Sequence, residues 1–180
     1  MTTQTETITL AGGCFWCIEA ALNTLQGIIS AKSGYMGGEA DTATYESVCS
    51  GQTGHAEVVQ VEISPEEISI RELLEVFFSL HNPTQLNRQG NDIGSQYRSG
   101  IFYHNASQKQ QAEQIIAEIE QDQIWPDPVV TEVTSATAFY PAEKHHQDYF
   151  NNNPENQYCQ LVVSPKLAKF KQTFANKLKV

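Results

Sequence analysis

The chain has 180 residues, of which 40% are hydrophobic and 18% are charged, and its formal net charge is −10. This length corresponds to one domain with long loops, so we expect a single domain over residues 1–180. The composition excludes global disorder, the negative charge disfavours nucleic-acid partners, and no apolar run approaches the roughly 18 residues of a membrane span.

Strand and helix patterns alternate along the chain. Residues 5–10 alternate in polarity and end at Gly12-Gly13, which predicts a strand followed by a tight turn. Residues 14–25 place apolar side chains three and four positions apart, as in an amphipathic helix. Similar patterns predict strands at 28–35, 55–63, 100–104 and 129–133, helices at 70–80 and 106–121, and a short helix at 142–150.

The order of these elements predicts the fold class. Over the first 104 residues it is β-α-β-β-α-β, the split βαβ order of ferredoxin-like sheets. We therefore predict an α+β fold, a ferredoxin-like two-layer sandwich with a βαββαβ core. Residues 36–54 and 81–98 are rich in Gly, Asn and Asp, and the tail beyond Tyr140 is similarly polar. Long polar segments around a small sheet favour a site built from functional loops.

The cysteine content and the N-terminal segment predict the cellular compartment. Four cysteines in 180 residues are too few for a disulfide scaffold. Residues 1–6 are polar and lack the basic start and apolar run of a secretory signal. We therefore expect a cytoplasmic protein whose thiols are either buried or reactive. We also expect a monomer. The absence of nucleotide-binding and zinc-ligand patterns leads us to expect no cofactor and no metal.

Cys14 follows the Gly12-Gly13 turn and opens the first expected helix. The backbone N–H groups and partial positive charge of a helix N-terminus stabilise a thiolate and lower the pKa of a cysteine. We therefore expect a reactive thiol, although cysteines also pack inertly in cores. Cys17 completes a C-x-x-C pattern, which is typical of a dithiol pair, of half a metal site, or of a second cysteine that packs in the core.

Glu57 is the second candidate catalytic residue. In strand 55–63 it alternates with Val59, Val61 and Ile63, so it points toward the core side. Burial disfavours the charged form of a carboxyl, which predicts a raised pKa and a general acid near neutral pH. The alternative is that the start of the strand bends away and exposes Glu57.

Aromatic side chains accompany these two groups. Trp16 lies outside the row of apolar side chains on its helix, so it either lines a substrate site or is covered by a loop. Phe15 lies within that row, which favours core packing. Tyr45 and Tyr97 occupy the two long loops and could donate hydroxyl hydrogens to a substrate oxygen. Asp92 is most simply a turn residue.

The sequence around these residues resembles the peptide methionine sulfoxide reductase A family, which reduces the S epimer of methionine sulfoxide. The similar blocks span residues 8–160 in the family's order. They are Gly13-Cys14-Phe15-Trp16, Tyr45-Glu46-Ser47-Val48-Cys49-Ser50-Gly51, Thr53-Gly54-His55-Ala56-Glu57, Gln89-Gly90-Asn91-Asp92-Ile93-Gly94-Ser95-Gln96-Tyr97-Arg98-Ser99 and His146-Gln147-Asp148-Tyr149.

The resemblance implies a role for each candidate residue. Cys14 attacks the sulfoxide sulfur, and Glu57 gives a proton to the departing oxygen. Tyr45 and Tyr97 hydrogen-bond that oxygen, and Asp92 orients its loop. A thiolate and a proton donor must therefore coexist at one pH, which requires opposite environmental effects on the two groups.

The resemblance also implies that Phe15 and Trp16 hold the substrate methyl group, and that methionine and a Cys14 sulfenic acid are formed. A second thiol then makes a disulfide that thioredoxin reduces. Cys17 stands where many members have glycine, which leaves two resolving thiols open. Cys159, in a polar segment expected to be mobile, resembles the recycling cysteine and is preferred, because a Cys14–Cys17 bridge must bend a helix start. A relay through both thiols stays open.

Two other classes of protein are considered beside this reductase. One is a thioredoxin-like thiol–disulfide oxidoreductase that uses Cys14 and Cys17. That class expects a longer βαβ segment before its C-x-x-C, whereas here the motif follows the first expected strand. The other is a small binding module whose thiol is incidental.

Overall fold

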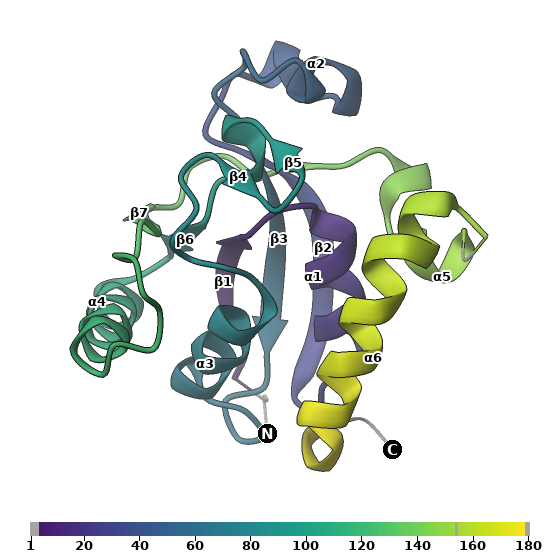
Figure 1. Cartoon of the computed structure of the whole chain (residues 1–180). Helices are drawn as coiled ribbons and strands as arrows, with labels where there is room; N and C mark the ends of the chain where they lie inside the picture. Colours follow the sequence, from purple (N-terminus) through teal and green to yellow (C-terminus); the bar gives the residue numbers. More distant parts are fainter. Residues whose placement is uncertain (1–3, 154, 179–180) are drawn as a thin grey trace.

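Strands and helices alternate along the computed structural model, which describes residues 4–153 and 155–178 (Figure 1). The main sheet comprises β1 (Glu6–Ala11), β2 (Ile28–Met36), β3 (Ala56–Ile63), β6 (Gly100–Tyr103), β7 (Glu132–Ser135) and β8 (Tyr140–Pro141), and a separate hairpin pairs β4 (Arg88–Gln89) with β5 (Asp92–Ile93). The α-helices are α1 (Phe15–Leu22), α2 (Tyr45–Cys49), α3 (Ile70–Leu80), α4 (Ala106–Gln121), α5 (Tyr149–Asn152) and α6 (Ser164–Thr173). Shorter turns are η1 (Ala40–Thr42), η2 (Ser95–Tyr97), η3 (Lys144–His146), η4 (Cys159–Val163) and η5 (Ala175–Lys177).

The main sheet has the strand order β7-β6-β1-β3-β2-β8. All its neighbouring strands are antiparallel except β6 and β7, which are parallel. The fold is therefore mixed α+β with a central, mostly antiparallel sheet and helices packed against it. The strands predicted at 5–10, 28–35, 55–63 and 100–104 are confirmed to within one residue at each end. The strand predicted at 129–133 begins only at Glu132.

Alternation along the strands separates two apolar layers. Ile8 and Leu10 of β1 belong to the main core with Val59 of β3, which is the register partner of Leu10. Helices α1 and α3 supply much of the rest of this core, and both lie in front of the sheet in Figure 1. Ala56 and Val58 belong instead to a smaller cluster. The odd-numbered positions of β3, including position 57, therefore share the main-core face.

Helices α3 and α4 begin where side chains accept hydrogen bonds from free backbone N–H groups. Ser69 Oγ accepts from the N–H of Glu72 at 3.1 Å, and Asn105 Oδ1 accepts from the N–H of Gln108 at 2.9 Å. Such caps stabilise a helix by about 1 kcal/mol each. The periodic apolar residues of both helices are buried, which explains why the predicted bounds 70–80 and 106–121 are confirmed.

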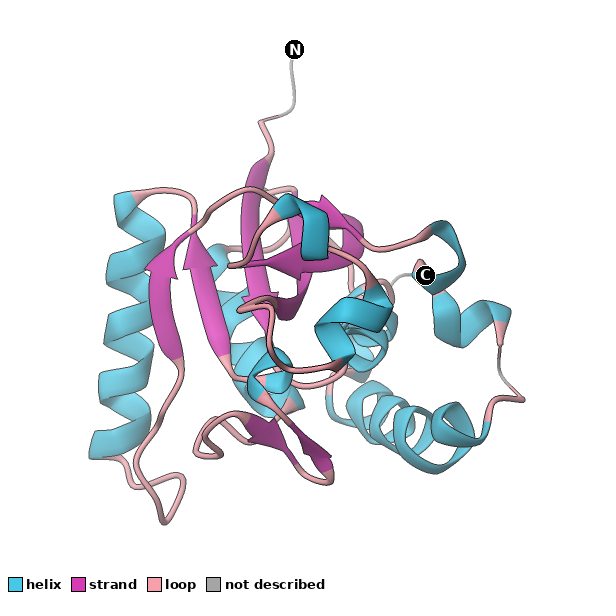
Figure 2. Ribbon diagram, turned by 90° about the horizontal axis from the view of Figure 1, so that it is seen from above, coloured by secondary structure: helices cyan, strands magenta, loops and turns pink. Residues whose placement is uncertain are grey.

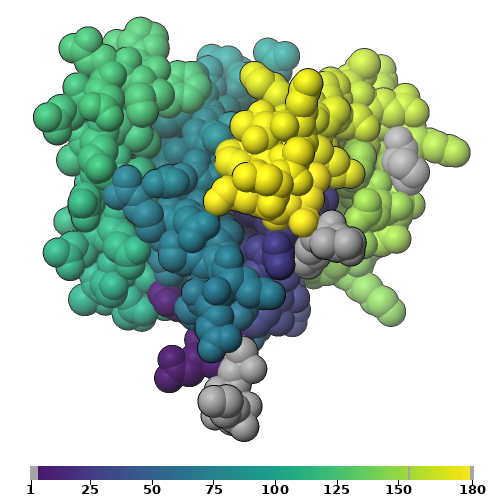
Figure 3. Space-filling view, turned by 90° about the horizontal axis from the view of Figure 1, so that it is seen from below, coloured from purple at the N-terminus to yellow at the C-terminus, as the bar shows by residue number. Residues whose placement is uncertain are grey.

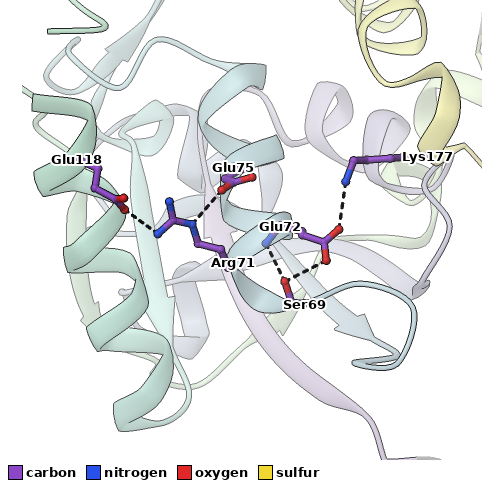
Figure 4. Close-up of polar contacts among 6 residues, drawn as sticks. All are labelled: Ser69, Arg71, Glu72, Glu75, Glu118 and Lys177. Atoms are coloured by element: carbon purple, nitrogen blue, oxygen red, sulfur yellow. Dashed lines mark hydrogen bonds and ion pairs between the residues drawn. The ribbon is translucent and has the colours of Figure 1, made fainter. Parts of the chain in front are cut away.

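Charged side chains connect α3 to its neighbours at the surface (Figure 4). Arg71 donates to Glu75 at 2.9 Å and to Glu118 of α4 at 2.6 Å. Lys177 of η5 donates to Glu72 at 3.1 Å. Exposed pairs of this kind contribute about 0–1 kcal/mol each, so the helices are held mainly by the core.

The C-terminal region differs most from the prediction. Instead of one helix over 142–150, the chain forms η3 and then α5, because Asp148 adopts a left-handed conformation with φ of 52°. Helix α6 follows and buries Leu167 and Phe170. It packs against α1, and the C-terminal segment lies beside α3 in the view from below (Figure 3).

Three expectations from the sequence concern segments that the structure describes only in part. None of the helices within residues 4–153 and 155–178 has the length and apolarity needed to cross a membrane. The absence of a signal sequence was expected from residues 1–6, of which 1–3 lie outside the described residues. Residue 154, within the expected recycling-cysteine segment, also lies outside them.

Candidate active site

A tight glycine turn places Cys14 at the start of α1. Gly13 adopts φ of 84°, and a Cβ at this position would lie 2.8 Å from Cγ of Gln89. Cys14 itself is the N-cap residue, with the extended conformation φ −63° and ψ 127°. Its carbonyl oxygen accepts the first hydrogen bond of the helix, from the N–H of Cys17 at 3.2 Å. The predicted position of the thiol at a helix N-terminus is confirmed.

The predicted lowering of the Cys14 pKa is wrong. Cys14 is 8% exposed, and burial raises its pKa well above the ordinary value, with the nearby Glu57 carboxylate as the second cause. The backbone N–H of Trp16 acts in the opposite direction but is outweighed. The thiol is therefore protonated in the resting protein at neutral pH.

Glu57 points into the core, as predicted from strand alternation. It is 1% exposed and lies opposite Tyr35 in the β2–β3 register. Its Oε1 accepts a hydrogen bond from the N–H of Phe15 at 3.2 Å, which places the carboxyl beside the peptide that follows Cys14. Burial raises the pKa of Glu57 to about 8, although the Phe15 N–H lowers it. Its Oε2 is buried and has no hydrogen-bond partner among the residues that the structure describes, so one carboxyl oxygen is anchored and the other is available.

The two long loops bring Tyr45 and Tyr97 to this carboxyl. Tyr45 is the first residue of α2, Tyr97 is the last of η2, and both are half-buried. Burial, followed by the charge of Glu57, raises the pKa of each hydroxyl far above its ordinary value. The charge of Cys14 contributes in the same direction to both. The hydroxyls therefore remain protonated donors near the thiol and the carboxyl. Figure 2 shows how the connecting segments surround this end of the sheet.

Asp92 does more than close a turn. It lies on β5, and its Oδ2 accepts a hydrogen bond from the hydroxyl of Tyr158 at 2.5 Å. Its negative charge raises the pKa of both Cys14 and Glu57, so Asp92 lies near both groups. The carboxylate thus connects the β4–β5 hairpin to the C-terminal segment at the edge of the site.

Trp16 and Phe15 occupy different environments. The Trp16 ring stacks on Tyr149 with centroids 4.0 Å apart and also lies beside Tyr45, 6.1 Å away. Its Nε1 is buried, and within residues 4–153 and 155–178 no group accepts a hydrogen bond from it. Phe15 is 0% exposed and packs between Tyr35 and Tyr45. Trp16 therefore forms part of an aromatic wall, while Phe15 lies within the core.

Cys159 lies in a buried environment, although its neighbours in the sequence are polar. Cys159 is 0% exposed, lies in the helical turn η4 and belongs to the main core. Its N–H donates to Asn156 Oδ1 at 3.2 Å. Cys17 is partly buried and packs against the same core, whereas Cys49 is exposed on α2. All four cysteines are free thiols.

A segment that sequence analysis did not interpret fixes the aromatic wall. Residues 143–149, here called the strap, carry Tyr149 and are bound to the body of the protein by three anchors. Glu143 accepts from the Tyr45 N–H at 3.0 Å, and Gln147 accepts from the Ser33 N–H at 3.0 Å. The third anchor joins Glu19 Oε1 to the N–H of Asp148 at 2.7 Å. The sequence signals for this segment were the short helix predicted at 142–150 and the resemblance block at 146–149, and neither indicated these anchors.

Glu19 is a buried carboxyl with no predicted role. It is 2% exposed, and burial raises its pKa to about 7, although the Asp148 N–H lowers it. No cluster of three or more His, Cys, Asp or Glu side chains in the described part of the chain is arranged to hold a metal ion.

Comparisons with known proteins agree on one family. A family model described as peptide methionine sulfoxide reductase matches residues 6–178. Peptide methionine sulfoxide reductase MsrA of Polynucleobacter asymbioticus is 53% identical over 169 residues, which is 94% of this chain and 89% of the relative.

Solved structures are similar as well. The crystal structure of reduced Mxr1 from Saccharomyces cerevisiae has a TM-score of 0.81 and 36% identity, and the match covers 88% of this chain and 91% of Mxr1. Mxr1 in complex with Trx2 has a TM-score of 0.57 and 28% identity, and covers 83% of this chain and 87% of that chain.

Proposed function

The chain belongs to the peptide methionine sulfoxide reductase family, and we propose that it reduces the S epimer of methionine sulfoxide, free or in peptides and proteins, through Cys14. The observation that carries this proposal is the Glu57 carboxyl. Its pKa is raised to about 8 by burial, one of its oxygens is held beside Cys14, and its other oxygen is unpartnered. Such a group is protonated at neutral pH and is suited to give a proton to a leaving oxygen.

In the proposed reaction the Cys14 thiolate attacks the sulfoxide sulfur while Glu57 protonates its oxygen. Tyr45 and Tyr97, whose hydroxyls stay protonated, donate hydrogen bonds to that oxygen. Methionine leaves, and Cys14 becomes a sulfenic acid, so the sulfoxide is reduced and the cysteine is oxidised by two electrons.

The protonation states of Cys14 and Glu57 are coupled. A negative charge on Glu57 raises the pKa of Cys14, so a doubly ionised site is disfavoured. Loss of one proton leaves a single negative charge, which resides on the thiol or on the carboxyl. The form with the charge on sulfur and the proton on Glu57 is the reactive one.

The remaining residues are proposed to position the substrate and to complete the cycle. Trp16 and Phe15 hold the methyl group, with Trp16 in the aromatic wall and Phe15 supporting it from the core. Asp92 orients its loop through the Tyr158 hydroxyl. Cys159 contributes to the disulfide that removes the sulfenic oxygen as water, and thioredoxin reduces that disulfide. The solved complex of Mxr1 with Trx2 supports a reductant of this class.

We also propose that residues 1–180 form a single domain with a ferredoxin-like βαββαβ core in two layers, in a monomeric cytoplasmic protein. The strand order β6-β1-β3-β2 with antiparallel neighbours supports this core, as does the position of α1 between β1 and β2 and of α3 between β3 and β6.

A single-turnover assay without added reductant tests the function. The reduced protein is mixed with an excess of the S epimer of N-acetylmethionine sulfoxide, and we expect one equivalent of methionine product and the loss of two thiols. Cys14→Ser should yield no product, whereas Cys49→Ser, which removes an exposed thiol, should match the wild type. Absence of product in the wild type would contradict the proposal.

The same protein also tests the rival classes. A thioredoxin-like oxidoreductase would reduce a protein disulfide through Cys14 and Cys17 and would form no methionine. An incidental thiol would form no intramolecular disulfide after addition of the sulfoxide.

A further inference from the structure

A carboxylate from a distant part of the chain holds the backbone of Tyr45. Glu143 Oε2 accepts a hydrogen bond from the Tyr45 N–H at 3.0 Å. The first N–H groups of a helix have no partner within the helix, and Tyr45 is the first residue of α2. The Thr44 side chain, which caps this helix, accepts instead from the Ser47 N–H. The backbone from which the Tyr45 hydroxyl projects is therefore fixed by Glu143.

The other oxygen of the same carboxylate is bound to the central sheet. Glu143 Oε1 accepts from the hydroxyl of Tyr35 at 2.9 Å. Tyr35 is 0% exposed, lies opposite Glu57 in the β2–β3 register, and packs on Phe15 with ring centroids 5.8 Å apart. Glu143 thus joins the loop that carries Tyr45 to the strand pair that carries the proposed proton donor.

The protonation state of Glu143 suits this bridge. Burial raises its pKa, but the hydrogen bonds from the Tyr45 N–H and the Tyr35 hydroxyl outweigh burial, so the pKa lies below its ordinary value. An ionised carboxylate accepts through both oxygens. A glutamine at this position would replace one of them by an NH₂ group, which cannot accept a hydrogen bond.

The ring of Tyr45 is held by the same segment as its backbone. His146 lies on the strap three residues after Glu143, and its N–H donates to the Glu143 carbonyl at 2.8 Å. The His146 ring packs on the Tyr45 ring with centroids 4.2 Å apart. The direction of the Tyr45 side chain therefore depends on where Glu143 holds the start of the strap.

We propose that Glu143 is a positioning residue for the reaction, which sets the place of the Tyr45 hydroxyl relative to the Glu57 carboxyl. This inference rests on the proposed reductase function and deepens it. Glu143 does not touch the substrate in this account, because both of its carboxyl oxygens accept from protein donors. It keeps the hydroxyl and the carboxyl at a separation from which both reach the same sulfoxide oxygen.

First-turnover kinetics test this role. The reduced protein is mixed with the S epimer of N-acetylmethionine sulfoxide over a range of concentrations, without added reductant, and methionine product is measured by rapid quench. Glu143→Ala should lower the limiting rate by roughly 10-fold, because a displaced hydroxyl stabilises the developing charge on oxygen less well. The half-saturating concentration should change by less than about twofold, because this hydrogen bond is strongest in the transition state.

The decisive measurement combines this variant with the loss of each tyrosine hydroxyl. When Tyr45 is already phenylalanine, adding Glu143→Ala should change the limiting rate by less than about twofold, because there is no hydroxyl left to position. When Tyr97 is phenylalanine instead, Glu143→Ala should again lower the rate by roughly 10-fold. Glu46→Ala, which removes an exposed carboxylate next to Tyr45, is the matched control and should match the wild type.

An unchanged limiting rate in Glu143→Ala would overturn the proposal. Equal slowing in the Tyr45→Phe and Tyr97→Phe backgrounds would also overturn it, because a general loosening of the fold does not depend on one hydroxyl. Glu143→Gln keeps one acceptor and should give an intermediate rate, and it carries the same comparison if the alanine variant does not fold. Failure of the wild type to form methionine product would instead overturn the proposed function, so the two failures are distinguishable.

Discussion

Replacing Glu57 by glutamine removes the proposed proton donor while keeping the size of the side chain. The amide oxygen can still accept the Phe15 N–H, which lies 3.2 Å from Glu57 Oε1. Loss of general-acid catalysis should slow methionine formation by roughly 10²-fold or more, which corresponds to an increase of about 2.7 kcal/mol in the activation free energy.

The same substitution should make Cys14 easier to ionise. The Glu57 charge is the second-largest cause of the raised Cys14 pKa, so its removal lowers that pKa while burial continues to raise it. Alkylation of the Cys14 peptide by iodoacetamide, followed by mass spectrometry across a pH series, should therefore begin at a lower pH than in the wild type. A more reactive thiol combined with slower sulfoxide reduction is specific to loss of a proton donor.

The first-turnover rate is measured by rapid quench with a saturating concentration of the S epimer. Glu62→Gln is the matched control, because Glu62 is on the same strand but on the opposite face from Glu57. This control should change neither the rate nor the alkylation profile. An unchanged first-turnover rate in Glu57→Gln would refute the assignment of Glu57 as the acid.

Two further predictions follow from buried polar groups. Tyr45→Phe and Tyr97→Phe each remove one donor to the sulfoxide oxygen and should slow the first turnover by roughly 10- to 100-fold, and the double variant should be slower than either. The first-turnover rates are measured by rapid quench, and thermal unfolding should show that the variants are as stable as the wild type. Full activity of both single variants would contradict the role of the hydroxyls. The folded protein raises the pKa of Glu19 from 4.5 to about 7. Protonated Glu19 therefore contributes fully to the free energy of unfolding below pH 4.5, and this contribution is lost as the pH rises through 7. Glu19→Gln can still accept the Asp148 N–H but does not titrate. Between about pH 5 and pH 8 its unfolding free energy, measured with denaturant, should fall by roughly 2 kcal/mol less than that of the wild type. An unaltered pH dependence would refute this account of Glu19.

Local periodicity was sufficient to predict much of the sheet and the position of Glu57. Successive side chains of a strand point to opposite faces, and the apolar residues within 55–63 identify the inward face. The inward direction of Glu57 could therefore be predicted without knowing which other strands pair with this one. Helix α3 was predicted to the residue from its apolar spacing, which is a local feature. The place of Tyr45 and Tyr97 in two polar loops suggested hydroxyl donors to a substrate oxygen, and the resemblance implied that this oxygen belongs to a sulfoxide.

The pKa of Cys14 could not be predicted in this way. A helix N-terminus is a local feature, but the burial that outweighs it comes from the tertiary packing of the main core, to which Cys14 belongs. The burial of Cys159 was missed for a related reason. Its polar sequence neighbours suggest exposure, whereas packing of α6 on α1 encloses it. Glu19 likewise gains its partner only from Asp148, far along the chain.

These non-local contacts explain how the site can hold a reactive sulfur without being generally reactive. Burial keeps both Cys14 and Glu57 protonated at rest, and the thiolate is the nucleophilic form of cysteine. In the proposed reaction a bound sulfoxide brings an oxygen toward the hydroxyls and the Glu57 proton, so negative charge that develops on that oxygen is stabilised as the sulfur attacks. A thiol with a pKa lowered by its helix alone would be ionised whether or not substrate was present. The buried Cys14 thiol and Glu57 carboxyl instead favour a substrate in which one atom accepts a proton while the adjacent atom is attacked by a nucleophile.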